Sequence, residues 1–207
     1  MRRLFTLFAA CVWAVSAFAQ TPEEILSRMD EEMSKHEDEG IIMTVDVKIP
    51  ILGTMSTRTY ALGDKYRIEA ETMGVKIITW SDGVSEWTYD SKKNEVEIKK
   101  ADPNKSTESE GDAELFSDIT DGYDVTLQKE TEKAWHFVCK KSKTNPDKDA
   151  PKTMDLVVAK GTYYPVSLTA KVSGFTMTMR DIEFGVTERQ VTFNPAECPG
   201  ATIIDKR

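Results

Sequence analysis

Apolar and polar residues alternate along most of this chain, which is the pattern of β-strands with one buried face. In the run 41–49, Ile41, Met43 and Val45 point to one side, while Thr44 and Asp46 point to the other. The same period predicts strands at 41–49, 54–62, 65–72, 75–80, 86–90, 94–99, 123–129, 134–141, 153–160, 165–172, 175–184 and 202–205.

One segment before the strands has a helical period instead. Thr21 is suited to cap a helix, Pro22 fits its first turn, and Glu24 completes a capping box. Gly40 ends the segment. The apolar positions form one narrow stripe, so we expect the helix to lie across a sheet rather than inside a bundle. These positions are Ile25, Leu26, Met29 and Met33.

Short turns of Gly, Asp or Asn join the first six predicted strands, and connections of that length join antiparallel neighbours. We therefore predict a single α+β domain. Its strongly curved antiparallel sheet of about eleven strands forms an open half-barrel wrapped around the N-terminal helix. The acidic stretch 101–120 interrupts the strands, and its segment 113–119 is predicted to form a short helix that would plug or flank the opening.

The N-terminus has the pattern of an export signal. Arg2 and Arg3 precede the apolar run 4–18, and Ala17-Phe18-Ala19 fits a cleavage site. We expect residues 1–19 to be removed after Ala19 and residues 20–207 to form the exported domain. A retained N-terminal anchor and a lipoprotein modified at Cys11 are the alternatives.

The charge of the chain excludes some partners. The net charge is −8, and removal of the signal lowers it further. So acidic a protein is a poor match for nucleic acid, and attachment to anionic lipid by charge is not expected. Export permits a disulfide between Cys139 and Cys198, and two free thiols are the alternative.

Catalytic and metal-binding patterns are missing from the sequence. The mature part has only two histidines, His36 and His136, and neither lies in a nucleophile motif. The acidic residues within 108–121 lack the ligand register of a calcium loop, and the cysteines and histidines lack zinc spacing. We expect no cofactor, no metal and no enzyme activity.

Apolar side chains are more abundant than one helix can cover, which indicates a cavity. Several are methionines, which adapt to varied apolar shapes and also serve as ordinary core filler. Two of the apolar side chains, Leu115 and Phe116, come from the predicted helical segment 113–119. The complete set predicted to line the cavity and its rim is Met43, Val45, Ile51, Leu52, Met55, Ile68, Val75, Ile77, Trp87, Tyr89, Ile98, Leu115, Phe116 and Leu156.

Two turns at the same end of the predicted sheet are apolar, although hairpin tips are usually polar. They are the loop 50–53, with Ile51 and Leu52, and the turn 73–74, with Met73. An apolar rim of this kind indicates a mouth for a hydrophobic ligand or a docking surface. Coverage by a neighbouring loop is the alternative.

Two motifs resemble those of the LolA-like outer-membrane lipoprotein carriers. The first is Ser81-Asp82-Gly83 followed by Trp87-Thr88-Tyr89-Asp90. The second is the C-terminal series 191–195, Pro199-Gly200 and 203–207. The order of signal, helix, six-strand meander, helical insert and further strands is also similar to that family.

The resemblance implies a periplasmic, monomeric carrier whose half-barrel is closed by a helical lid. Such a carrier receives the acyl chains of a lipoprotein from an inner-membrane releasing complex and delivers them to an outer-membrane acceptor. An envelope-stress sensor or regulatory module that binds lipid in the same cavity is the alternative. In that family an arginine in the turn after the second strand helps to hold the lid, and the turn 62–65 here has no arginine. The resemblance therefore implies either that the lid is held in a different way or that the ligand differs.

Overall fold

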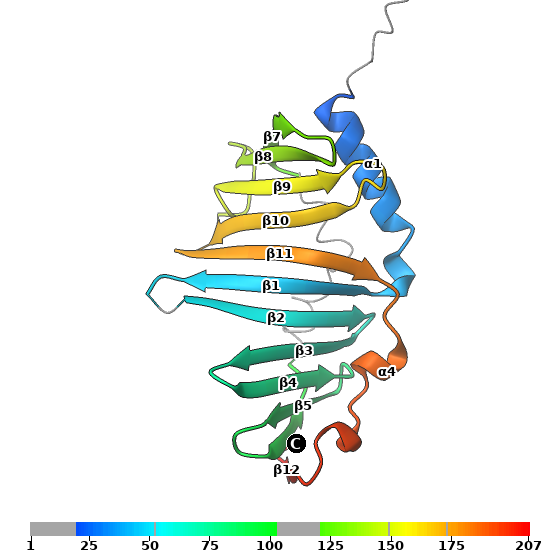
Figure 1. Cartoon of the computed structure of the whole chain (residues 1–207), viewed down its shortest axis with the longest axis vertical. Coiled ribbons are helices and arrows are strands. Elements are labelled where there is room, and N and C mark those ends of the chain that lie inside the picture. The colour runs from blue at the N-terminus through cyan, green and yellow to red at the C-terminus, as the bar shows by residue number, and fades with distance from the viewer. Residues whose placement is uncertain (1–19, 52, 103–120, 149, 173) are drawn as a thin grey trace, which may run out of the picture.

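A single antiparallel sheet with one parallel edge strand organises the protein (Figure 1). The computed structural model describes residues 20–51, 53–102, 121–148, 150–172 and 174–207. In these residues the sheet has 12 strands in the order β12-β6-β5-β4-β3-β2-β1-β11-β10-β9-β8-β7. The edge strands β7 and β12 lie far apart, so the curved sheet is open, as predicted (Figure 1).

The observed strand bounds agree closely with the predicted ones. Half of the strands match at both ends, among them β3 and β8, and the others are displaced by a single residue at one or both ends. The strands are β1 (Ile41–Ile49), β2 (Gly53–Leu62), β3 (Lys65–Thr72), β4 (Val75–Ser81), β5 (Ser85–Asp90), β6 (Glu95–Lys100), β7 (Tyr123–Glu130), β8 (Ala134–Lys141), β9 (Thr153–Ala159), β10 (Pro165–Val172), β11 (Phe175–Phe184) and β12 (Thr202–Asp205).

Helix α1 (Pro22–Ser34) begins at the predicted capping box. Thr21 Oγ1 accepts from the Glu24 amide at 3.2 Å, and Glu24 Oε2 accepts from the Thr21 amide at 2.9 Å. The helix ends at Ser34, before a short turn η1 (Glu37–Glu39) that leads to Gly40. Its apolar stripe is buried in one cluster with residues of β8, β9 and β10 and with the buried ends of β1, β2 and β3.

The C-terminal segment runs along the other side of the sheet. Helix α4 (Glu188–Val191) packs on β2 and β3, and the turn η2 (Pro195–Glu197) follows it. Strand β12 then pairs with β6 in parallel, which places the chain end beside the β5–β6 hairpin (Figure 1).

The strand register defines the two faces of the sheet, because directly opposed residues share a face. The helix face contains Leu156, Met179, Val45, Ile68 and Ile77. The tail face lies opposite, beneath the C-terminal segment.

Candidate functional site

The part of the helix face beneath α1 is a closed core. Phe137, Leu156 and Val158 are at most 1% exposed and pack with the stripe of α1. Met43 extends this core into β1 at 4% exposure. Met43 and Leu156, both predicted to line a cavity, are therefore core residues in the structure.

Beyond α1, the same face stays apolar but becomes accessible. Val47 on β1 has Met55 of β2 and Met177 of β11 as its direct neighbours. All three side chains retain exposure, and Met55 is 43% exposed. The half-buried and exposed apolar residues of β11 and β1 to β4 on this face form a surface that we call the trough: Val45, Val47, Ile49, Met55, Ile68, Ala70, Val75, Ile77, Phe175, Met177 and Met179.

Polar residues bound the trough at β5. Ile77 is opposed by Asp90, Thr79 by Thr88, and Ser81 by Glu86. The trough therefore ends between β4 and β5.

Near this boundary, Tyr66 Oη donates to Glu86 Oε2 at 2.8 Å. Burial of Tyr66, and then this hydrogen bond, raise its pKa to about 12. Tyr66 thus stays a neutral donor at the polar end of an otherwise apolar surface.

Trp87, Tyr89 and Ile98 do not lie in the trough, so their predicted grouping with Val75 and Ile77 is wrong. Tyr89 is opposed by Ile78, and Trp87 is opposed by both Trp80 and Ile98. These residues share the tail face. The reason for the error is that β4 is apolar on both sides, so alternation alone does not assign the face of its neighbour β5.

On the tail face, the two sequence motifs contact each other. Phe193 stacks on Trp87 at a centroid distance of 5.5 Å and meets Trp80 edge-on at 5.3 Å. Cys198 completes this buried cluster at 4% exposure. The aromatic residues of the first motif therefore serve to hold the C-terminal segment.

Polar contacts hold the same segment at three more points. Arg207 Nη1 donates to Ser85 Oγ at 3.2 Å, and Asn94 Nδ2 donates to the carbonyl oxygen of Gly200 at 3.0 Å. Arg67 pairs with Glu197 at 2.9 Å. Together with the aromatic stack, these contacts make the motifs one structural unit.

The other predicted residues divide into two groups. Val45, Met55, Ile68, Val75 and Ile77 lie in the trough, and Ile51 lies at the exposed tip of the β1–β2 hairpin. Leu52, Leu115 and Phe116 fall outside the described residues, as do the signal 1–19 and the lid segment 113–119.

The trough also contains residues that were not in the set predicted to line the cavity. Val47, Phe175, Met177 and Met179 come from β1 and β11, which pair although they are far apart in sequence. The alternation of 175–184 was a signal for the strand, but it did not reveal which strand lies beside it.

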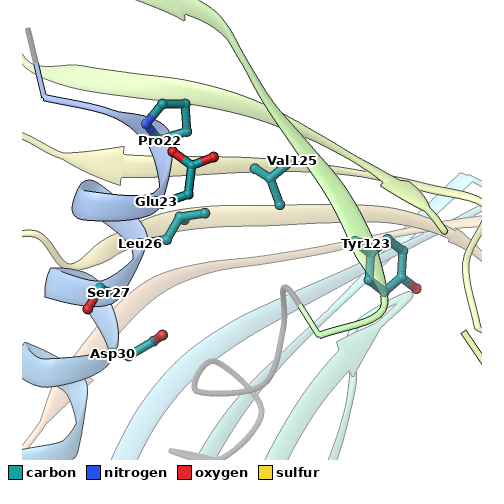
Figure 2. Close-up of a pocket in the computed structure, with 7 residues that line it drawn as sticks. All are labelled: Pro22, Glu23, Leu26, Ser27, Asp30, Tyr123 and Val125. Atoms are coloured by element: carbon teal, nitrogen blue, oxygen red, sulfur yellow. The ribbon is translucent and has the colours of Figure 1, made fainter. Parts of the chain in front are cut away.

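A separate groove opens where α1 meets the edge strand β7 (Figure 2). Its volume is about 360 Å³, within the roughly 300–1,000 Å³ of small-ligand sites. Leu26, Tyr123 and Val125 give it an apolar wall, and Glu23 and Asp30 add carboxylates from α1 (Figure 2). The lining of this groove is therefore mixed, with polar and apolar groups side by side.

The cysteines lie in different clusters on opposite faces, Cys139 in the helix-face core and Cys198 beneath the tail. Both thiols are free. Burial raises the pKa of Cys139 to about 11 and also raises that of Cys198. Within the described ranges, no cluster of three or more His, Cys, Asp or Glu side chains is placed to hold a metal ion. None of the described helices is long and apolar enough to cross a bilayer.

Comparison with known proteins gives structural likeness without sequence matches. No family model matches the chain, and no curated protein matches it. Among solved structures, the chain is similar to an uncharacterized conserved protein from Thermus thermophilus, with 18% identity, 90% of this chain and 100% of that chain covered, and a TM-score of 0.48. It is also similar to the lipoprotein LppX from Mycobacterium tuberculosis, with 11% identity and a TM-score of 0.49. The match covers 81% of this chain and 98% of LppX.

A third similar structure is a LolA superfamily protein from Nitrosomonas europaea, with 12% identity and a TM-score of 0.32. The match covers 84% of this chain and 99% of that protein. Structures of LolA-like proteins are thus among those that the chain is similar to. At such identities the likeness concerns the fold alone.

Proposed function

We propose that this protein binds the apolar chains of a lipid or lipoprotein in the trough. The observation that carries the proposal is the contrast along one face: the residues beneath α1 are buried, whereas those of the trough have the same apolar character and are only half-buried or, at Met55 and Phe175, exposed. A contiguous apolar surface of this kind marks a binding site for an apolar ligand or partner.

The chemistry required of such a site is burial rather than catalysis. Each methylene removed from water contributes about 0.8 kcal/mol, so a chain of ordinary length gains useful affinity from the trough without a charged contact. Flexible methionines at Met55, Met177 and Met179 suit chains of varied shape. We infer a binding protein without enzymatic activity.

The export pattern at residues 1–19 and the motif resemblance extend this proposal to the envelope. There the protein acts as a periplasmic carrier that moves lipoproteins between an inner-membrane releasing complex and an outer-membrane acceptor. Depletion of the protein then leaves lipoproteins at the inner membrane. Normal lipoprotein sorting in depleted cells would favour the alternative, a regulatory module that binds lipid in the same place.

Mass spectrometry of the gently purified protein tests the binding step. We expect a co-purifying lipid or lipoprotein, lost in Ile77→Gln, whose side chain lies in the trough. Lys76→Gln is the matched control, because Lys76 is exposed on the same strand and points to the other face. Equal lipid content in both variants would refute the proposal.

A further inference from the structure

Two hairpin tips place apolar side chains in a backbone conformation that disfavours them. Ile51 has φ 74° and Met73 has φ 52°, both in the left-handed region. A β-branched residue is a genuine outlier there, and hairpin turns usually place Asn, Asp or Gly at such positions. The β5–β6 turn follows that rule, with Asn94 at φ 52°.

Other strained positions in the described residues have a local reason. Tyr163, at φ 61°, packs on Trp135 at 5.3 Å, and Asp181, at φ 53°, pairs with Arg180 beside a β-bulge. Ile51 and Met73 have no such packing, since they are 105% and 99% exposed. The fold gains nothing from these two side chains, and unexplained strain of this kind is typical of functional positions.

The two tips belong to one end of the sheet. The β1–β2, β3–β4 and β10–β11 turns all lie along the left margin in Figure 1, and Phe175 at the start of β11 is 42% exposed. Neighbouring hairpins in a sheet are about 10 Å apart, twice the strand spacing. These side chains are therefore separate protrusions, which suit a soft apolar medium better than one protein pocket.

Positive charge surrounds the tips, although the whole chain has a net charge of −8. Lys48 and Lys171 flank Thr176 from the strands on either side, next to Phe175. The β5–β6 turn adds Lys92 and Lys93. Lys76 also lies at this end, as do the acids Glu71, Asp90 and Glu95.

The connections at the opposite end of the sheet are acidic. In the ranges 35–40, 63–64, 82–84, 131–133 and 160–164, acids outnumber bases. The acids are Glu37, Asp38, Glu39, Asp64, Asp82 and Glu132, and the bases are Lys35, Lys133 and Lys160. The connecting turns at the two ends therefore differ in charge, while Lys99, Lys100, Lys206 and Arg207 lie beside the acidic turns at the ends of β6 and β12.

We infer that the lysine-rimmed end docks on the surface of an anionic lipid bilayer, with Ile51 and Met73 inserted into its interface. Apolar tips supply burial, and the surrounding lysines supply attraction to anionic head groups. This inference goes beyond the proposed function and does not depend on it, because the inserted residues Ile51 and Met73 are not part of the trough.

Co-sedimentation of the protein with vesicles tests the inference. The vesicles are phosphatidylcholine mixed with phosphatidylglycerol, compared with phosphatidylcholine alone, and the variant is Ile51→Asn/Met73→Asn. Asparagine tolerates the left-handed region, so this variant should unfold at the same temperature as the parent or a higher one. Val84→Asn is the matched control, because Val84 is an exposed apolar residue in the Asp82–Ser85 turn at the other end.

The parent and Val84→Asn should bind anionic vesicles equally, and the double variant should bind about tenfold more weakly. Binding should also fall on neutral vesicles and with added salt. An unchanged affinity in the double variant would overturn the inference. The inference would also be overturned if the parent protein did not bind anionic vesicles. Cross-linking of the parent through residue 51 to an envelope protein, without vesicle binding, would be one such result.

Uptake of a monomeric fluorescent fatty acid separates this inference from the proposed function. The double tip variant should retain uptake, whereas Ile77→Gln should lose uptake and retain vesicle binding. If Ile77→Gln still takes up the fatty acid, binding in the trough is refuted, whereas the docking surface is unaffected. Loss of vesicle binding in Ile77→Gln would contradict the separate docking surface.

Discussion

Trp87 and Phe193 stack with their rings 10° from parallel, and this contact joins the two motifs of the sequence. Phe193→Ala should therefore destabilise the fold by about 2 kcal/mol, less than a fully buried phenylalanine because Phe193 is half-buried. Urea unfolding measures the loss. Arg189→Ala, at an exposed position in α4, should have little effect.

The same variant separates the tail face from the trough. Because Phe193 is on the far side of the sheet from Ile77, folded Phe193→Ala protein should still bind lipid. If folded Phe193→Ala protein no longer bound lipid, the first sequence motif would be part of the binding site after all.

The thiols should stay reduced and unreactive in the native protein. Cys139 and Cys198 lie on opposite faces, and burial raises the pKa of both, so little thiolate forms at neutral pH. Iodoacetamide at pH 8 should label them only after urea is added. For Cys139, the raised pKa contributes stability below the ordinary pKa of the thiol, and that contribution is lost as the pH rises toward about 11. Rapid native labelling, or a disulfide in non-reducing mass spectrometry, would contradict the placement.

An ion pair between β1 and β11 makes part of the stability depend on pH. The Arg180 guanidinium donates to Asp46 at 2.6 Å, and this contact lowers the pKa of Asp46 below its usual range. The contribution is present above the ordinary pKa of Asp46 and is lost as the pH falls through the lowered one. Solvent reaches the pair, so Asp46→Asn should cost less than about 1 kcal/mol at neutral pH.

Urea unfolding of both proteins at neutral and acidic pH checks this assignment. The difference between the parent and Asp46→Asn should shrink in acid. A difference that grows in acid would mean that Asp46 is not held ionised by Arg180.

The Ser-Asp-Gly turn should be sensitive to a methyl group at Gly83. Gly83 has φ 81°, and an added Cβ would lie 2.8 Å from Asp64 Oδ2. Gly83→Ala should destabilise by more than the roughly 1 kcal/mol expected from the backbone strain alone. Gly63→Ala is the control, because Gly63 has φ 58° and open space around it. Equal losses in both variants would show that Asp64 moves away without cost.

Strand positions could be predicted because alternation is a local property of the sequence. Lys65–Thr72 and Phe175–Phe184 were predicted at both ends, since turn residues bound them. The face of β5 could not be predicted, because Ile77 and Ile78 are adjacent apolar residues on β4 and both choices bury one of them.

The trough was predicted only in part for a related reason. Val45 and Ile77 lie in the predicted meander, whereas Met177 joins them through the pairing of β1 with β11. That pairing closes a long loop, and no local pattern specifies it. The tail that covers Trp87 is likewise a long-range partner, so the aromatic pair was assigned to the wrong surface.

Cross-linking with a photoreactive fatty acid, mapped by mass spectrometry, tests the central claim most directly. We expect labels on trough residues of β11 and β1 to β4, such as Val47, Met55, Ile77 and Met177. Labels confined to Trp87 and Tyr89, or no labels above those on a denatured control, would contradict lipid binding in the trough.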